Sequence, residues 1–292
     1  MSHRSASSIR IPSAFNGLYG LRPSYGRVPY AGCVNSLEGQ DSVRSVLGPL
    51  TNSLGAVKSF MKSVVSQKPW LKDPLAVRKQ WNEEEYGLVE HGHGKNLCFG
   101  ILWDDGDVMP HPPIRRGLEA AKQALIAAGH KGKDSFLLFC NFFMFVIVID
   151  WKPFKHMEIF KAVVSTPSRF NVIIFRFTYH FFQIQMAIWS AGAKEDYRVA
   201  TLPSGEPVIS TMNLAIDNPD LAENVPAFRL LPDGISAYEL WQVQKLKRDL
   251  REDYLDYWNA SVDLTGTGRP VDAILSPCAP FVAPPHGMNK YV

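Results

Sequence analysis

Cysteines are few in this 292-residue sequence, and they lie far apart. None belongs to a C-x-x-C pair; the four are Cys33, Cys98, Cys140 and Cys278. Structural zinc sites and small disulfide frameworks need closely spaced or paired cysteines. We therefore expect reduced thiols, no metal or other cofactor, and a cytoplasmic protein.

The sequence also lacks a strong charge of either sign. Its 31 basic and 28 acidic residues leave a net charge of +3, and they are scattered along the chain. A nucleic-acid or membrane surface calls for a concentrated basic patch, so we expect neither as a partner. The N-terminus is polar, without the apolar stretch of a secretory signal. A hydrophobic content of 46% fits a soluble globular protein.

No apolar run reaches the 18 or more residues of a membrane span. The longest, 136–149, has 14 residues, and a second window at 170–189 contains Arg176 and His180. Ten of the 17 phenylalanines lie in these two windows. Three interpretations stay open: buried strands, a membrane anchor at 136–149, or translated non-coding sequence. The abrupt change in composition favours the third, with retained introns at about 132–148 and 165–186.

Three short motifs resemble ligand sites without completing one. His91 and His93 have no carboxylate or third histidine nearby, so a solvated loop is favoured over a metal clip. Residues 104–107 begin like a calcium loop but lack its later ligands. The loop 265–270 has two glycines but no lysine–serine pair, as a phosphate loop requires.

Strand and helix patterns alternate along the chain. Residues 97–103 read as a buried strand, and a helix follows from Pro113 to about Ala128. Residues 271–275 form a later strand that Ser276-Pro277 ends. A strand followed by a helix is half of a βαβ unit, so the pattern predicts an α/β fold.

Other segments yield narrower predictions. Residues 43–50 resemble a short strand, and a helix begins near Ser53, with its apolar side chains at helical spacing. Residues 66–95 are polar and broken, as in a surface excursion. Ser236 and Glu239 form a capping box at the start of a long helix.

The most concentrated turn chemistry lies at the start of the chain, in 8–23. A serine, Ser8, precedes an apolar-basic-apolar-proline run, and two glycines and a second proline follow. Such a run favours a fixed backbone path, and long ordered loops are often functional. Ser8 is the candidate site residue, while a surface loop with a chance serine is the alternative.

These residues resemble the amidase signature family, in its fungal acetamidase-like branch. Ser8-Ile9-Arg10-Ile11-Pro12-Ser13 is similar to the end of the signature, and 16–24 extend it. Later landmarks follow in the family's order: Glu38-Gly39-Gln40, Gly48-Pro49-Leu50, residues 150–156 and Asp272-Ala273-Ile274-Leu275-Ser276-Pro277. The resemblance covers most of the chain outside the two phenylalanine-rich windows.

The resemblance implies an α/β/α fold around a mixed central sheet. It also implies hydrolysis of a small carboxylic amide by a Ser–cis-Ser–Lys triad, in which Ser8 takes the place of the nucleophile. The family's lysine and middle serine precede the nucleophile by more than the seven residues found here, and Ser7 replaces a glycine of the oxyanion hole. We therefore expect residues 1–292 to be one partial amidase domain, truncated at both ends.

Two functional hypotheses follow. The first is an amide hydrolase with Ser8 as nucleophile; the second is a catalytically dead fragment or interaction protein. A serine without a general base forfeits about 10²–10⁴-fold in rate, so we expect this polypeptide to be inactive.

Overall fold

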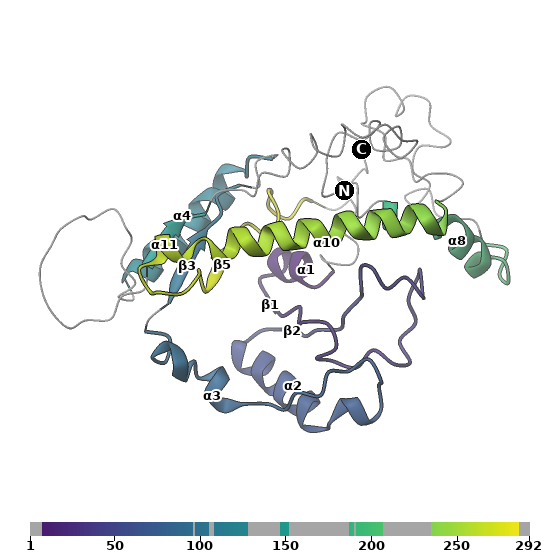
Figure 1. Cartoon of the computed structure of the whole chain (residues 1–292), viewed down its shortest axis with the longest axis horizontal. Helices are drawn as coiled ribbons and strands as arrows, with labels where there is room; N and C mark the ends of the chain where they lie inside the picture. The colour runs from purple at the N-terminus through teal and green to yellow at the C-terminus, as the bar shows by residue number, and fades with distance from the viewer. Residues whose placement is uncertain are drawn as a thin grey trace, which may run out of the picture.

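The computed structural model describes residues 8–95, 97–104, 108–127, 147–151, 187–189, 191–206 and 235–285. The described chain carries a parallel sheet with helices beside it and, below it in Figure 1, a second region built from the N-terminal third. The long helix α10 (Ala237–Asn259) runs across the molecule above α1 (Arg10–Phe15).

The parallel sheet confirms the predicted α/β class. Its described strands have the order β4 (Ile147–Asp150), β3 (Cys98–Ile101), β5 (Ala273–Leu275), and both neighbouring pairs are parallel. Helix α4 (Pro112–Ala127) follows β3 along the chain, with Leu118 buried. The strand predicted at 97–103 and the helix predicted from Pro113 are both present.

The main core lies where the sheet meets the C-terminal end of α10. Cys98, Ile149, Trp151 and Val271 are buried there, and Tyr257 and Trp258 pack against them. The Trp151 ring lies 5.0 Å from that of Tyr257, edge to face. Since aromatic side chains bury large areas, this cluster fastens α10 to the sheet.

Helix α10 begins as its sequence predicts. The Ser236 hydroxyl accepts a hydrogen bond from the Glu239 amide, and the Glu239 carboxylate accepts one from the Ser236 amide, which completes the capping box. Near this end Val243 packs with Ile188 and Trp189, close to α8 (Ala193–Thr201). The short α11 (Val262–Thr265) follows α10.

The N-terminal region confirms one expected element and corrects another. Helix α2 (Leu54–Ser66) starts at the expected N-cap, where the Ser53 hydroxyl accepts from the Ala56 amide. The strand expected at 43–50 is wrong. Only β2 (Leu50–Thr51) forms, paired antiparallel with β1 (Tyr19–Gly20). Pro49 has no N–H to donate, and Gly48 packs too closely on Leu21 for a regular ladder.

The expectation of a surface excursion at 66–95 is partly wrong. This segment forms η1 (Pro69–Leu71), α3 (Glu83–Tyr86) and η2 (Val89–His91), and Asp73 is buried within it. The Asp73 carboxylate accepts hydrogen bonds from the amides of Tyr30, Ala31 and Leu75. These bonds hold the pKa of Asp73 below its ordinary value, with the Tyr30 amide contributing most. A polar residue therefore organises the loop from within.

Most of the two phenylalanine-rich windows lies outside the described residues. Ile147 and Val148, at the end of the window expected to be an insertion, belong to β4 and pair with β3. The last residues of the proposed anchor at 136–149 are thus in a strand of the sheet. Among the described residues no helix is long and apolar enough to cross a membrane.

Candidate active site

Ser8 lies at the turn that leads into α1. Its side chain is exposed, whereas the next residue, Ile9, is buried and occupies the N-cap position of the helix. Ser13 is buried one turn later, and its hydroxyl donates to the Ile9 carbonyl at 2.7 Å. Pro12 falls in the first turn, where proline is tolerated. The sequence therefore presents the Ser8 hydroxyl at the surface on an anchored turn.

Two glycines let neighbouring segments approach this turn. A Cβ on Gly20 would lie 2.1 Å from the Ser13 hydroxyl, so β1 can pack against α1 only if position 20 is a glycine. A Cβ on Gly48 would lie 2.1 Å from the Leu21 carbonyl oxygen and 2.8 Å from Ile9 Cδ1. The close approach explains why glycines recur in the motif around Ser8.

The segment that leaves the carboxyl end of β5 returns to α1. The Phe15 and Phe281 rings are 6.1 Å apart. Burial raises the pKa of the Cys278 thiol, and the nearby Arg10 guanidinium opposes that rise. Ligands of parallel α/β sheets bind beyond the carboxyl ends of the strands. The position of α1 on this side agrees with a site at Ser8.

The first two lysines after Ser8 in the sequence, Lys58 and Lys62, have acidic partners. Lys58 forms an ion pair with Glu83 at 3.3 Å and lies 3.9 Å from the centre of the Tyr86 ring. Lys62 also pairs with Glu83, and these partners lower the pKa of Glu83 to about 2, Lys62 most strongly. No lysine is therefore assigned as the base for Ser8 within the described residues.

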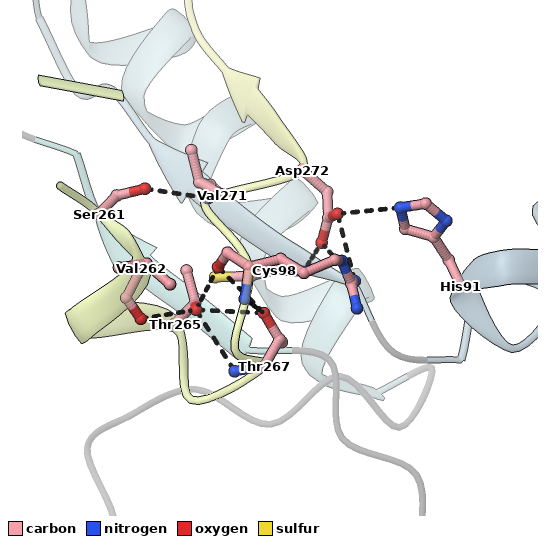
Figure 2. Close-up of polar contacts among 9 residues, drawn as sticks. His91, Cys98, Ser261, Val262, Thr265, Thr267, Val271 and Asp272 are labelled. Atoms are coloured by element: carbon pink, nitrogen blue, oxygen red, sulfur yellow. Dashed lines mark hydrogen bonds and ion pairs between the residues drawn. The ribbon is translucent and has the colours of Figure 1, made fainter. Parts of the chain in front are cut away.

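A second polar group lies at the amino ends of β3 and β5 (Figure 2). Asp272 is its centre: one carboxylate oxygen accepts from the Cys98 amide at 2.7 Å, and both lie within 3.4 Å of the Arg269 guanidinium. The Asp272 amide in turn donates to the Cys98 carbonyl at 2.9 Å. These bonds join the start of β5 to the start of β3 across 174 residues of sequence.

The rest of this polar group closes the loop before β5. The fully buried Thr265 hydroxyl donates to the Arg269 carbonyl at 2.6 Å, and the Ser261 hydroxyl accepts from the Val271 amide at 3.0 Å. Figure 2 shows that these hydroxyls form their hydrogen bonds with backbone groups of the protein itself. The loop 265–270, expected to be a poor phosphate loop, thus has its hydroxyls engaged with protein groups.

The two histidines of 91–93 point to different partners. The imidazole of His91 lies 3.5 Å from Asp272, and the His93 ring lies 3.2 Å from the Gly87 carbonyl. Within the part of the chain that the structure describes, no three histidine, cysteine or acidic side chains are grouped as metal ligands. Residues 105–107 of the calcium-like turn lie outside the described residues.

Sequence reasoning missed the roles of Asp73 and Asp272. Asp272 was part of a recognised motif, yet nothing local indicates that its partner is the Cys98 amide. Asp73 had a faint signal, because an aspartate that bonds the amide two residues ahead is common in turns. The return of Cys278 toward Arg10 had no sequence signal at all.

Comparison with known sequences agrees with the resemblance found in the motifs. The sequence model described as Amidase matches residues 5–292. The chain is similar to the acetamidases of Emericella nidulans, 32% identical over 285 residues, and of Aspergillus oryzae, 32% identical over 287 residues. Each alignment covers 97% of this chain, but 42% and 43% of the two acetamidases. The chain therefore spans about two fifths of the length of these relatives.

Comparison with solved structures shows the fold. The chain resembles a structure named fatty acid amide hydrolase, with a TM-score of 0.66 and 23% sequence identity. The likeness covers 96% of this chain and 39% of that chain. The sequence comparison and the structural comparison thus agree with each other.

Proposed function

Because this chain belongs to the amidase family, we propose that it carries the nucleophile-bearing part of an enzyme that hydrolyses small carboxylic amides, with Ser8 as the nucleophile. The observation that carries the proposal is the exposed Ser8 at the head of the signature motif, on the turn that leads into α1. Its support is the family match over residues 5–292 together with the approach of the segment after β5.

In the proposed reaction the Ser8 oxygen attacks the amide carbonyl carbon while a base takes its proton. The tetrahedral intermediate then expels the amine, which receives a proton as the C–N bond breaks. Water hydrolyses the acyl-enzyme ester and frees Ser8. Serine is a poor nucleophile at its own pKa, so the first step depends on the base. In the Ser–cis-Ser–Lys arrangement this base is a lysine that its surroundings keep neutral.

We propose further that a polypeptide of these 292 residues alone does not complete the catalytic group. Lys58, the first lysine after Ser8 in the sequence, is held by Glu83 and Tyr86. The cytoplasm is the proposed location, and the thiols of Cys33 and Cys278 are compatible with it.

Direct assay tests the inactivity of this polypeptide. Purified residues 1–292 are incubated with acetamide and benzamide, and separately with a fluorophosphonate probe. We expect no turnover and no labelling of Ser8, because an unactivated hydroxyl loses about 10²–10⁴-fold of general-base catalysis. Turnover or labelling that disappears in Ser8→Ala would show that this chain supplies its own base.

A chimera tests Ser8 as nucleophile separately. Residues 5–292 replace the aligned region of the Emericella nidulans acetamidase, whose remaining residues are kept. We expect acetamide hydrolysis by the chimera, and its loss in Ser8→Ala but not in Ser13→Ala, whose hydroxyl is buried and bonded to Ile9. A folded chimera that is equally active with Ser8→Ala would refute the assignment.

The alternative function is a catalytically dead fragment or interaction protein. Both functions predict that a polypeptide of residues 1–292 is inactive, but only the amidase function predicts acetamide hydrolysis by the chimera. A chimera that folds, as its circular dichroism reports, yet hydrolyses no acetamide would favour this alternative.

A further inference from the structure

Three cationic side chains gather where α10 packs against the loop 41–44. Lys247 on α10 donates a hydrogen bond to the Ser42 carbonyl, and Gln244 donates to the Ser42 hydroxyl at 2.8 Å. Arg44 follows two residues later in the loop, with its guanidinium 4.4 Å from the centre of the Tyr25 ring. In Figure 1 the loop lies below the half of α10 that is nearer α8.

A third cation lies one helical turn beyond Lys247. Arg251 is four residues further along α10, so both side chains lie on the same helix face. The pKa of Lys247 is lowered, first by burial and then by the positive charges of Arg251 and Arg44. Arg251 and Arg44 are thus both close enough to Lys247 for their positive charges to act on it.

One acidic group offsets part of this charge. Asp41 lies 3.6 Å from the Arg44 guanidinium and is its ion-pair partner. Among the described residues, no carboxylate lies within ion-pair distance of Lys247 or Arg251. Three cations with one carboxylate at this junction, where Lys247 is half-buried and Arg44 and Arg251 are exposed, form a natural position for an anion.

We propose that Lys247, Arg251 and Arg44 bind a dianionic phosphate group at the junction of α10 and the loop 41–44. The ligand would offset the mutual repulsion of the cations. Guanidinium groups match the oxygens of a phosphate in pairs, and a lysine ammonium serves as a point charge. The two ends of the site come from segments that are about 200 residues apart, so occupancy also ties the loop to α10. The proposal does not depend on the amide hydrolysis proposed above.

Calorimetric titration of residues 1–292 tests the site. Inorganic phosphate and glycerol phosphate are titrated at pH 7.5, with sodium chloride at matched ionic strength as the reference. We expect saturable binding of a phosphate and none of chloride. Tighter binding of glycerol phosphate would identify a phosphate ester as the source, and tighter binding of inorganic phosphate would identify the free ion. Absence of saturable binding of both would overturn the proposal.

Matched variants on α10 separate the site from the general charge of the helix. Lys247→Gln and Arg251→Gln should each weaken phosphate binding by about tenfold, the value of one charge-assisted hydrogen bond. Lys245→Gln and Arg248→Gln remove the same charges elsewhere on the helix, where Lys245 bonds Gln242 and Arg248 pairs with Asp249, and should bind as the parent does.

Two further variants separate binding from loop position. Arg251 makes no bond to Ser42, so a loss in Arg251→Gln cannot come from release of the loop. Lys247→Arg keeps the charge and should retain binding within about threefold. Equal affinities of Lys247→Gln, Arg251→Gln and the two control variants would overturn the proposal, with circular dichroism confirming that each variant is folded.

Discussion

At the scale of the residue, glycines and one aspartate of the N-terminal third make packing and hydrogen-bond contacts that their neighbours in the sequence do not indicate. Gly48 lies against the Leu21 backbone, and the Asp73 carboxylate accepts hydrogen bonds from three backbone amides. The contacts of Gly48 with Leu21 and of Asp73 with Tyr30 and Ala31 join segments that are distant in sequence. Around Ser8, such contacts hold the backbone while leaving the hydroxyl exposed.

Gly48→Ala should destabilise the protein. The new methyl group would lie 2.1 Å from the Leu21 carbonyl oxygen, 2.8 Å from Ile9 Cδ1 and 2.9 Å from Pro23 Cδ, so backbone would have to shift. Overpacking of this kind costs about 1–3 kcal/mol in the free energy of unfolding. Urea denaturation followed by circular dichroism measures the change.

Gly117→Ala is the matched control. Gly117 lies within α4 with open space around its Cα, so alanine should stabilise the helix by about 0.5–1 kcal/mol. Equal effects of the two substitutions would contradict the packing of Gly48.

At the scale of the element, helix starts were the most predictable feature. Ser53 and Ser236 begin α2 and α10 as their local sequences indicate, because a hydroxyl at the N-cap bonds an amide within the next turn. The strand expected at 43–50 failed for a different reason. Gly48 lies against Leu21 and Ile9, Val43 packs with the cluster around Val243, and Pro49 has no N–H to donate, so most of the segment stays a loop.

Ser236→Ala should lower the free energy of unfolding by about 0.5–2 kcal/mol, because the Glu239 amide at the start of α10 loses its acceptor, the Ser236 hydroxyl. Thermal melting monitored at 222 nm measures it. Ser59→Ala, on an exposed position within α2, is the control and should leave stability unchanged or slightly raised. Equal losses in both variants would argue against the capping box.

At the scale of the whole molecule, polar contacts between distant segments complement the aromatic core. Asp272 joins β5 to β3, Asp73 joins its own segment to Tyr30 and Ala31, and Trp151 packs with α10. The Asp73 carboxylate makes stability depend on pH, since its bonds to backbone amides require the ionised form.

Acid should destabilise the protein through Asp73. Its pKa in the folded state is below the ordinary value of 3.8, so its contribution is fully present above that value. The contribution is lost as the pH falls through the lowered folded-state pKa. Urea denaturation at several pH values between about 2 and 6 should show a fall that is smaller in Asp73→Asn.

High salt distinguishes the contribution of Asp73 to the pH dependence of stability from that of Glu83, whose pKa is also lowered. Glu83 is exposed and depends on lysine side chains, so 1 M salt, where the Debye length is about 3 Å, should remove its effect. The Asp73 effect rests on backbone amides and should persist. Asp263→Asn in α11 is the control, and an identical loss there would contradict the role of Asp73.

The family, the α/β class and the position of Ser8 could be read from residues close together in sequence. A motif is a local pattern, and hydroxyl caps, helical periodicity and turn residues act within a few positions of one another. The roles of Asp73 and Asp272, the return of Cys278 to Arg10 and the grouping of Arg44 with Lys247 depend on the folded chain. Each joins residues that are tens to hundreds of positions apart, and no local preference specifies which distant partner a carboxylate or an ammonium group will meet.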